Sequence, residues 1–402
     1  MLSRQGANLL VSSRSILVIN CGSSSLKFAL IEPATGEMLC RGLAERLGAE
    51  GASLALDAHA PAPLGAHASH AEALDRILAE LGGRSVAAVG HRVVHGGEAF
   101  SDSVVLEPAA IASIEACSEL APLHNPANLR GIRAGLERYP DLCHVAVFDT
   151  AFHHTLPPRA YLYAVPYELY TKHKVRRYGF HGTSHRYVAG VAAERLGKPS
   201  AELELVTAHL GNGCSAAAVR GGRSVDTTMG LTPLEGLVMG TRSGDVDPNL
   251  HEFLADHTGR SLPEITNLLN RQSGLLGLSG SSNDMRTLLD AKARGDERAK
   301  LAIDVFCYRL AKAVLGLAAA LDRVDALVFT GGIGEHAAPI RAQTLDALRL
   351  LRPVLDPRSN DAHGRETNGR ITHESSALTA LVVPTNEELV IARETARLAF
   401  GA

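Results

Sequence analysis

Two segments of this chain, far apart in the sequence, share one plan of strands and turns. The first begins at Ile16 and reads ILVINCGSSSLKFALIEPATGEMLCRG: an apolar strand, a Gly/Ser turn, a second apolar strand, a turn at PATGE and a third strand. The second begins at Leu203 and reads LELVTAHLGNGCSAAAVRGGRSVDTTMG, with GNG at its first turn and RGGR at its second. This repetition predicts two domains of like topology, each opening with a glycine-turned hairpin.

The remaining chain alternates helices with apolar strands. Between the hairpins, helical patterns near residues 70–82 and 108–120 accompany the strands VAAVGHRVV and HVAVFD. In the second half, a helix over residues 298–322 precedes the strand ALVFT, and another helix, the strand ALVVPT and a final helix NEELVIARETARLAF follow. Because 402 residues exceed the usual size of one hydrophobic core, we expect an α/β protein of two domains with helices covering buried sheets.

Composition excludes several classes of protein. The net charge of -3 provides no basic face for a nucleic acid, and no apolar run approaches the roughly 20 residues that cross a bilayer. The six scattered cysteines form no disulfide framework, which predicts a reducing, cytoplasmic location. The first fourteen residues, MLSRQGANLLVSSR, contain arginines and serines but no acid. That composition is found in organelle transit peptides, but we interpret the segment as a short extension before the first strand.

Both hairpin turns carry residues suited to phosphate. In NCGSSSLK, Gly22 allows a tight turn whose amides can converge on an anion, Ser23 and Ser25 add hydroxyl donors, and Lys27 adds positive charge. A polar hairpin turn explains this segment equally well, because serine is common in turns. The second hairpin, with glycines after the strand in AHLGNG (208–213), favours two turns that face one polyphosphate across a cleft.

The segment FTGGIGEHA also follows a buried strand and contains glycines. From Gly332 to Ala337 it reads G-x-G-x-x-A, and Asp356 lies where a ribose-binding acid would stand in a dinucleotide-binding domain. Too little chain follows Ala337 to build such a domain. We therefore predict close backbone approach to a nucleotide by another route.

Charged residues at strand ends and in glycine-flanked loops are candidates for catalysis. Arg92 ends a strand in GHRVVHGGE, and Arg242 lies in MGTRSGDVDP, where a guanidinium could grip a carboxylate or phosphate. A solvated surface charge is the alternative for each. Asp149 ends a buried strand, the usual place for a catalytic or metal-binding acid. His181 and His185, four apart in GFHGTSH, have zinc-ligand spacing, but flanking glycines and the lack of a third ligand nearby argue against zinc.

Together these motifs resemble the acetate kinase family across nearly the whole chain from Ile16: VINCGSSSLKF, GHRVVHGGE, FDTAFH, YGFHGTSH, HLGNG, MGTRSGDVDP, FTGGIGE and PTNEEL occur in the family's order. The resemblance implies two domains of duplicated ribonuclease-H-like topology, as in actin-like ATPases, with an ATP cleft between them. We expect an N-terminal extension over 1–15, a first domain over 16–152 plus 386–402, and a second over 153–385. The family also implies a homodimer.

The resemblance further implies reversible Mg²⁺-dependent transfer of the γ-phosphoryl of ATP to acetate, giving acetyl phosphate and ADP, with Mn²⁺ as a substitute metal. Such transfer needs in-line positioning and charge compensation. By the resemblance, Arg92 and Arg242 hold the carboxylate and the moving phosphoryl, His181 donates to that phosphoryl, and Asp149 organises the site. The metal is placed by Asn20, Asp149 and Glu387.

The other implied roles concern binding. Val94 stands two residues after Arg92, so strand alternation would put it on the same face against the alkyl end of the acid, while His124 in PLHNP lines the same cleft. The residues implied at the nucleotide are Ser23, Ser25, Lys27, His209, Leu210, Gly211, Asn212, Gly213, Asp284, Met285, Arg286, Gly332, Ile333, Gly334, Glu335 and His336. His336 departs from the asparagine expected after GGIGE, which leaves the details of base or ribose recognition open.

Three alternative functions fit parts of the sequence. A propionate kinase would share the catalytic set and differ in a few pocket side chains. A metal-dependent hydrolase would use Asp149, His153, His154 and His181. A nucleotide-binding scaffold would need an ATP site but neither Arg92 nor Arg242, so the retained arginines argue against it.

Overall fold

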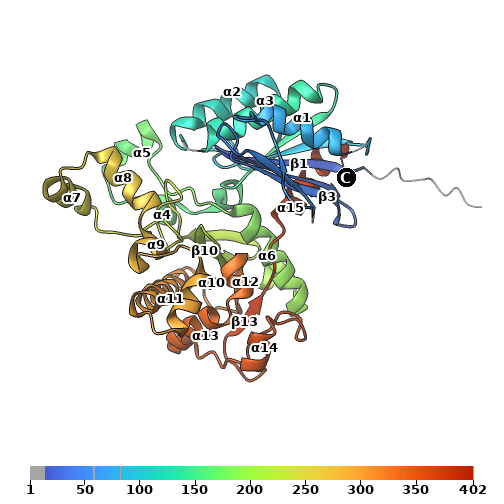
Figure 1. The fold of residues 1–402 in the computed structure, drawn as a ribbon. Coiled ribbons are helices and arrows are strands. Elements are labelled where there is room, and N and C mark those ends of the chain that lie inside the picture. The colour runs from blue at the N-terminus through green and yellow to red at the C-terminus, as the bar shows by residue number, and fades with distance from the viewer. Residues whose placement is uncertain (1–13, 58, 82, 123, 402) are drawn as a thin grey trace, which may run out of the picture. The chain divides into compact units, whose positions relative to one another are not determined.

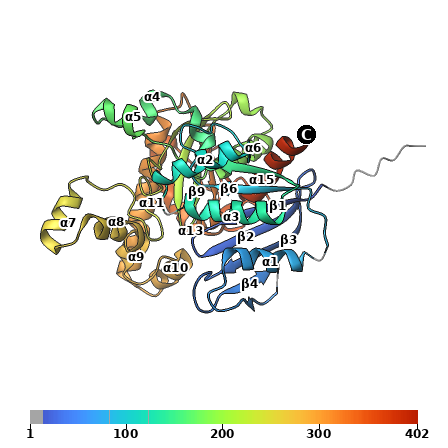
Figure 2. The same ribbon diagram turned by 90° about the horizontal axis from the view of Figure 1, so that it is seen from above.

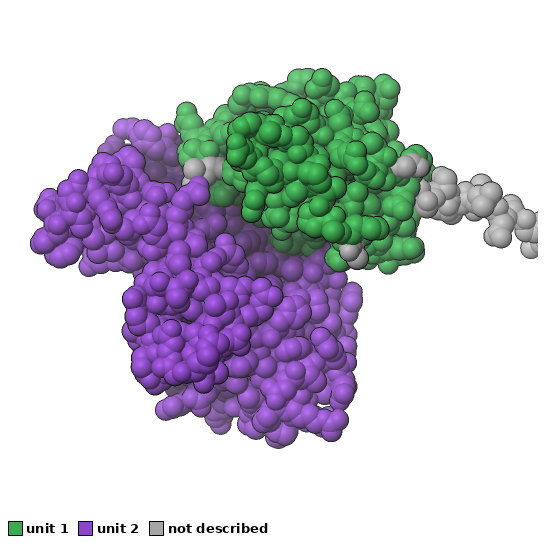
Figure 3. Space-filling model, viewed as in Figure 1, with its two compact units in different colours: residues 1–148, 387–402 green, residues 149–386 purple. Residues whose placement is uncertain are grey.

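The structure is a computed structural model that describes residues 14–57, 59–81, 83–122 and 124–401. Its internal contacts divide the chain into unit 1, Met1–Phe148 with Glu387–Ala402, and unit 2, Asp149–Asn386 (Figure 3). The chain therefore changes unit after residues 148 and 386, whereas the sequence analysis places these changes after 152 and 385. Most of the expected extension, residues 1–13, lies outside the described residues. Its last two residues pack on unit 1, because Ser15 is buried and the Arg14 guanidinium lies 4.6 Å from the centre of the Phe400 ring.

The first hairpin, β1 and β2, lies in the middle of the sheet of unit 1. β1 and β2 pair antiparallel and β2 pairs antiparallel with β3, while β6 runs parallel to β1 and β8 parallel to β6. The full strand order is β5-β4-β3-β2-β1-β6-β8-β7. The strands span Ile16–Cys21 (β1), Ser25–Glu32 (β2), Glu37–Glu45 (β3), Ser53–Leu56 (β4), Ala62–Pro63 (β5), Ala88–Val93 (β6), Val104–Val105 (β7) and Cys143–Phe148 (β8).

Helices cover both faces of this sheet. On one face α1 (His70–Glu80) and α3 (Asn125–Arg138) enclose a core that includes Leu17, Phe28 and Leu74, with α2 (Pro108–Ala116) against α3 (Figure 2). On the opposite face α15 (Glu387–Phe400), the last helix of the chain, packs against β1, β6 and β8 (Figure 1). A side chain at Gly90 of β6 would collide with α15, because its Cβ would lie 2.4 Å from Oγ1 of Thr395.

The sheet of unit 2 repeats the plan of unit 1. β9 and β10 pair antiparallel, β10 and β11 pair antiparallel, β12 runs parallel to β9 and β13 parallel to β12, in the order β11-β10-β9-β12-β13. Strand for strand, this matches β3-β2-β1-β6-β8 in order and direction. The predicted α/β fold with a duplicated topology is confirmed. The strands span Glu204–Leu210 (β9), Cys214–Arg220 (β10), Arg223–Thr227 (β11), Ala326–Thr330 (β12) and Thr379–Val382 (β13).

The helices α6 and α11 pack against the strands of this second sheet. α6 contributes Val188, Ala192 and Ala193 to a core with β9, β12 and β13, and α11 packs against β9 and β10 (Figure 1). The GGIGEH segment is helical and forms α12. The helices of unit 2 span Pro158–Tyr161 (α4), Tyr167–His173 (α5), Gly182–Leu196 (α6), Leu250–Thr258 (α7), Leu262–Arg271 (α8), Gly274–Ser279 (α9), Met285–Ala293 (α10), Glu297–Ala318 (α11), Gly331–His336 (α12), Ala338–Ala347 (α13) and Pro357–Asp361 (α14).

Candidate active site

The turn between β9 and β10 brings together two of the predicted catalytic residues. A Cβ built on Gly213 would lie 3.4 Å from Nη1 of Arg242 and 3.4 Å from both Cε1 and Nε2 of His181. Gly213 and Gly211 have no positive φ, so neither is needed for a left-handed backbone. At Gly213 the missing side chain instead leaves the backbone bare beside an imidazole and a guanidinium, both of which can donate hydrogen bonds to an anion.

His181 lies at the start of α6, where the backbone of Asp149 holds it. It has a left-handed backbone with φ 56, and the next amide, Gly182 N, donates to the backbone oxygen of Asp149 over 2.9 Å. A Cβ on Gly182 would lie 2.3 Å from that oxygen, so the close approach requires glycine. The His181 ring stacks on His209, with ring centres 4.3 Å apart. Asp149, predicted to organise the site, is buried directly beside this helix start.

Arg242 projects from a loop that docks on α9. Its Nη1 donates to the backbone oxygen of Pro233 over 3.2 Å, and burial lowers the pKa of the guanidinium. The amides of Leu275 and Leu276 donate to the backbone oxygens of Met239 and Gly240 in the loop. These contacts position Arg242 through backbone groups, so its placement does not depend on a surface ion pair.

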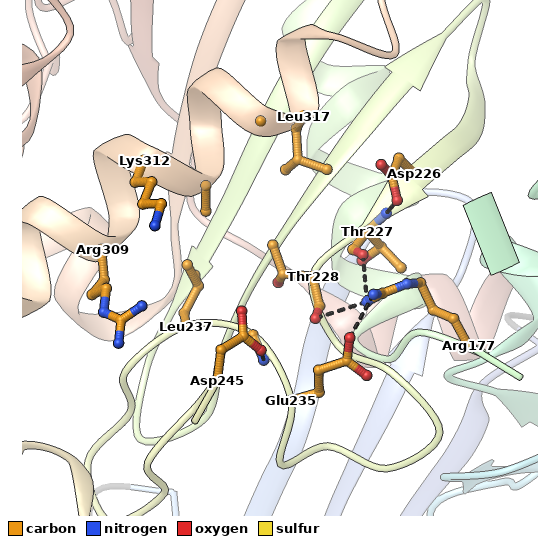
Figure 4. Close-up of a pocket in the computed structure, with 13 residues that line it drawn as sticks. Arg177, Asp226, Thr227, Thr228, Glu235, Leu237, Asp245, Arg309, Lys312 and Leu317 are labelled. Atoms are coloured by element: carbon orange, nitrogen blue, oxygen red, sulfur yellow. Dashed lines mark hydrogen bonds and ion pairs between the residues drawn. The ribbon is translucent and has the colours of Figure 1, made fainter. Parts of the chain in front are cut away.

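A network of hydrogen bonds holds the two ends of the loop that carries Arg242 (Figure 4). Glu235 accepts hydrogen bonds from Tyr163 and from Arg177, and Nη1 of Arg177 donates to the backbone oxygens of Thr227 and Thr228 over 2.9 and 3.0 Å. The two ends of the loop bind each other, because Gly236 N donates to Oδ1 of Asp245. The Arg177–Glu235 pair therefore joins the segment that precedes His181 to the loop that carries Arg242.

A cavity of about 540 Å³ lies beside the same β9–β10 turn. Its wall includes Asp284, which caps α10 by accepting from the amides of Arg286 and Thr287. The hydrogen bonds from the Arg286 side chain and these amides hold the pKa of Asp284 down to about 2. The lining residues are Gly211, Asn212, Asn283, Asp284, Met285, Arg286, Leu289, Gly332, Ile333, His336 and Ala337. Most of them were predicted to contact the nucleotide, and Asn283, Leu289 and Ala337 were not.

Several residues predicted at the nucleotide lie away from that wall. Leu210 has no exposed surface and belongs to the core of the sheet, so its side chain does not face the cavity. Glu335 points to backbone amides: its Oε1 accepts from Gly331 N over 3.0 Å and from Thr385 N over 3.1 Å. The carboxylate therefore connects α12 to the segment that follows β13. Gly334 is buried within α12. Asp356, which was not predicted to bind the nucleotide, caps α14 by accepting from the Ser359 amide.

In unit 1, predicted residues gather where β1, β2 and β6 meet. Asn20 pairs across the hairpin with Lys27, so their side chains share one face of the sheet. Nη1 of Arg92 donates to Oδ1 of Asn20 over 3.3 Å. Glu387 is the first residue of α15, which covers this face. The turn at Gly22 is tight, as predicted: Gly22 N donates to the backbone oxygen of Ser25 over 2.8 Å, without a positive φ at Gly22.

Ser23 and Val94 lie in irregular backbone near this face. Ser23 is exposed in the hairpin turn. β6 ends at Val93, so Val94 lies one residue beyond the strand, and its amide donates to Oδ1 of Asn128 over 3.0 Å. The strand therefore ends before Val94, and its position beside Arg92 stays a prediction. His124 precedes α3, whose Asn128 makes this contact.

The contacts of His153 argue against the hydrolase alternative, and those of His185 argue against a zinc pair with His181. Both ring nitrogens of buried His153 are occupied, since Nδ1 lies 2.7 Å from Oγ of Ser224 and Nε2 lies 3.0 Å from the backbone oxygen of Phe180. His185 is likewise buried between Ser215 and Thr207. Among the described residues, no group of three or more His, Cys, Asp or Glu side chains is arranged to hold a metal ion. Asn20, Asp149 and Glu387 remain suitable oxygen donors for Mg²⁺, which uses few protein ligands beside substrate phosphates.

Comparison with known proteins decides the family. The model of the acetokinase family matches residues 15–393. The chain belongs to the acetokinase family. A relative named acetate kinase from Deinococcus radiodurans is 56% identical over 391 residues, covering 96% of this chain and 98% of the relative. The acetate kinase of Chromobacterium violaceum is 54% identical over 391 residues, with the same coverage of 96% and 98%.

Solved structures of acetokinases share this fold. A propionate kinase from Francisella tularensis superposes with a TM-score of 0.91 at 46% identity, covering 96% of this chain and 99% of that structure. The acetate kinase of Porphyromonas gingivalis superposes with a TM-score of 0.89 at 44% identity, covering 95% and 98%. Two further properties accord with the sequence analysis. All six cysteines are free thiols, and none of the described helices is long and apolar enough to cross a membrane.

Proposed function

We propose that this protein catalyses the reversible transfer of the γ-phosphoryl group of ATP to acetate, giving acetyl phosphate and ADP. The observation that carries the proposal is the convergence of His181 and Arg242 on the bare backbone of Gly213, next to a cavity whose wall includes Gly211 and Asn212. A nucleotide in that cavity would have its phosphates toward the glycine turn. Membership of the acetokinase family supports the same reaction.

Phosphoryl transfer mainly requires groups that compensate the negative charge on the phosphoryl oxygens. A phosphoryl group in transfer carries negative charge on oxygens that only accept hydrogen bonds, and donors fixed in advance stabilise it without reorganising. Arg242 and His181 are such donors, held by backbone contacts and by the start of α6. Arg92 would bind the carboxylate of the acceptor. Acetate is already ionised near neutral pH, so no general base is needed and Asp149 acts as an organiser.

We also propose Mg²⁺ as the metal, with Mn²⁺ as a substitute. Asn20, Asp149 and Glu387 would hold it, and Ser23, Ser25 and Lys27 would contact phosphate. When bound, the ion would neutralise charge on the phosphate oxygens. The oxygen chemistry of these side chains favours a hard cation over zinc.

For the acceptor we propose acetate over propionate, with Val94 and His124 beside its methyl group. Relatives named acetate kinase reach 57% identity, and the propionate kinase structure is 46% identical. Only a few pocket contacts separate these acids, since one methylene is worth roughly 1 to 3 kcal/mol.

We further propose a cytoplasmic homodimer. The free cysteines support a reducing compartment. Large apolar side chains of unit 2 are exposed, among them Tyr167 at 64% and Tyr308 at 65%, as expected of a surface that binds a second copy. Sedimentation measurements would test the dimer.

The decisive experiment is an ATP-dependent hydroxamate assay with formate, acetate, propionate and butyrate. Acetate should give the highest kcat/KM, and omission of Mg²⁺ should abolish product. Failure to form acyl phosphate from any acid would overturn the proposed function, whereas a preference for propionate would change only the acceptor.

A further inference from the structure

A continuous line of hydrogen bonds leads through the interior of unit 2 to His181. Nδ1 of His181 lies 2.8 Å from Oγ of Ser215, and the same oxygen lies 2.8 Å from Nε2 of His185. Nδ1 of His185 lies 2.7 Å from Oγ1 of Thr207. Ser215, His185 and Thr207 have no exposed surface, so water does not compete for these contacts.

The number of protons available to these side chains limits the direction in which each hydrogen bond can run. His185 is neutral, because burial, helped by His153 and His209, holds its pKa well below the ordinary value. A neutral imidazole donates at one nitrogen and accepts at the other. Within the described part of the chain, the Ser215 hydroxyl bonds only to the two imidazoles. It therefore accepts from one ring and donates to the other.

Two arrangements satisfy these conditions. In the first, the Thr207 hydroxyl donates to Nδ1 of His185 over 2.7 Å rather than to the backbone oxygen of Ala217, which lies 3.5 Å away. Nε2–H of His185 then donates to Ser215, and Ser215 donates to Nδ1 of His181. In the second, each bond runs in the opposite direction and Nδ1 of His181 carries the proton. Only the first leaves a neutral His181 with its proton on Nε2, the nitrogen that borders Gly213 near Arg242.

The chemistry beside Gly213 favours the first arrangement. A phosphoryl oxygen can accept but cannot donate, so it needs an N–H at Nε2. In the second arrangement Nε2 would gain a proton only if the ring became a cation near the half-buried guanidinium of Arg242, where repulsion between the two like charges disfavours it.

We propose that Ser215 and His185 are positioning residues that hold His181 as the Nε2–H tautomer, with this N–H directed to the phosphoryl group in transfer. The tautomer follows from contacts within unit 2, and only its use in catalysis rests on the proposed function. Sequence reasoning missed Ser215, although it lies two residues after Gly213 on β10. His185 was considered only as a zinc ligand.

The test is the protonation of His181 in the full-length protein labelled with ¹⁵N-histidine. Long-range ¹H–¹⁵N spectra distinguish a protonated from a bare ring nitrogen, and the His181 signals are assigned by their loss in His181→Gln. The wild type should carry its proton on Nε2. In Ser215→Ala, Nδ1 loses its donor, so the signals should shift toward a mixture of tautomers.

Ser224→Ala is the matched control, because Ser224 is also fully buried and also bonds a buried histidine, His153. It should leave the His181 signals unchanged. Ser215→Thr keeps the hydroxyl and should keep the Nε2–H signal, which guards against misfolding of the alanine variant. The proposal would be overturned if the wild type carried the proton on Nδ1 of His181. It would also be overturned if the His181 signals were unchanged in a folded Ser215→Ala protein.

Kinetics separate this inference from the proposed function. In Ser215→Ala, kcat should fall about tenfold with KM for ATP unchanged, a smaller loss than the roughly hundred- to thousandfold expected when a donor is removed. If the wild type forms no acyl phosphate but holds the Nε2–H tautomer, the proposed function fails and the tautomer stands. If kcat does not change in Ser215→Ala although the tautomer shifts, the catalytic role is refuted.

Discussion

Replacement of Gly213 by alanine tests whether the bare backbone beside His181 and Arg242 is where phosphoryl transfer occurs. Gly213 has no positive φ, so alanine can adopt its backbone conformation. The added Cβ would lie 3.4 Å from Nη1 of Arg242 and from Nε2 of His181, an ordinary van der Waals separation. The free energy of unfolding should change by less than about 1 kcal/mol, because the reduced freedom of the unfolded chain offsets small adjustments.

Turnover should respond far more strongly than stability. An oxygen that accepts from both donors must come within about 2.9 Å of each nitrogen, and the new methyl group already contacts both. Losing donors aimed at developing charge costs roughly 3 to 4 kcal/mol, so we expect kcat to fall about 10²- to 10³-fold. The hydroxamate assay measures turnover, and urea unfolding measures stability.

Gly190→Ala is the control within α6, the helix that begins after His181. A Cβ at Gly190 would meet no atom within 4 Å. This variant should keep the wild-type kcat and gain roughly 0.5 to 1 kcal/mol of stability, because glycine is unfavourable inside a helix. A folded Gly213→Ala protein with nearly wild-type kcat would refute the placement of the reaction beside this turn.

Four further predictions concern the remaining site residues. Arg242→Ala should lower kcat about 10²-fold or more with ATP binding nearly intact by calorimetry, and nearly normal turnover would contradict its role. Asp149→Ala should abolish most Mg²⁺-dependent activity, whereas stoichiometric zinc in active wild-type protein would contradict a magnesium site. Val94→Ala should raise kcat/KM for propionate relative to acetate, and an unchanged ratio in the folded variant would remove Val94 from the pocket. Asp284 has a folded pKa of about 2, held down mainly by Arg286, so its ionised form stabilises the fold above about pH 4 and that contribution is lost as pH falls toward 2. The stability difference between wild type and Asp284→Asn, from urea unfolding, should therefore shrink over this range, and a constant difference would contradict the shift.

The sequence was sufficient to predict the architecture. Strands with apolar runs, glycine turns and helices with apolar faces are local patterns, and the same local pattern at Ile16 and at Leu203 folds into sheets of the same strand order. The predicted helical face of α11 is likewise buried at Ala302, Phe306 and Leu310. Local periodicity predicts such features because each element must bury one face regardless of its partner.

Details that depend on where an element ends could not be predicted in this way. Val94 lies one residue beyond β6, where its amide donates to Asn128, and the glycine-rich GGIGEH segment forms the short helix α12. Glu335 is fixed by amides of Gly331 and Thr385, the second of them fifty residues away in the sequence. Boundaries and side-chain directions of this kind follow from contacts between segments that no short window of sequence contains.

The amino-acid sequence by itself determined the duplicated α/β topology and the types of residue available for chemistry, because these follow from periodicity, turn propensity and composition. Only the tertiary structure decided that Gly213 lies against His181 and Arg242, and that Ser215 joins His181 to His185. The physical reason is distance: hydrogen bonds act over about 3 Å, and only packing brings the residues that form these contacts, which are far apart in the sequence, so close together.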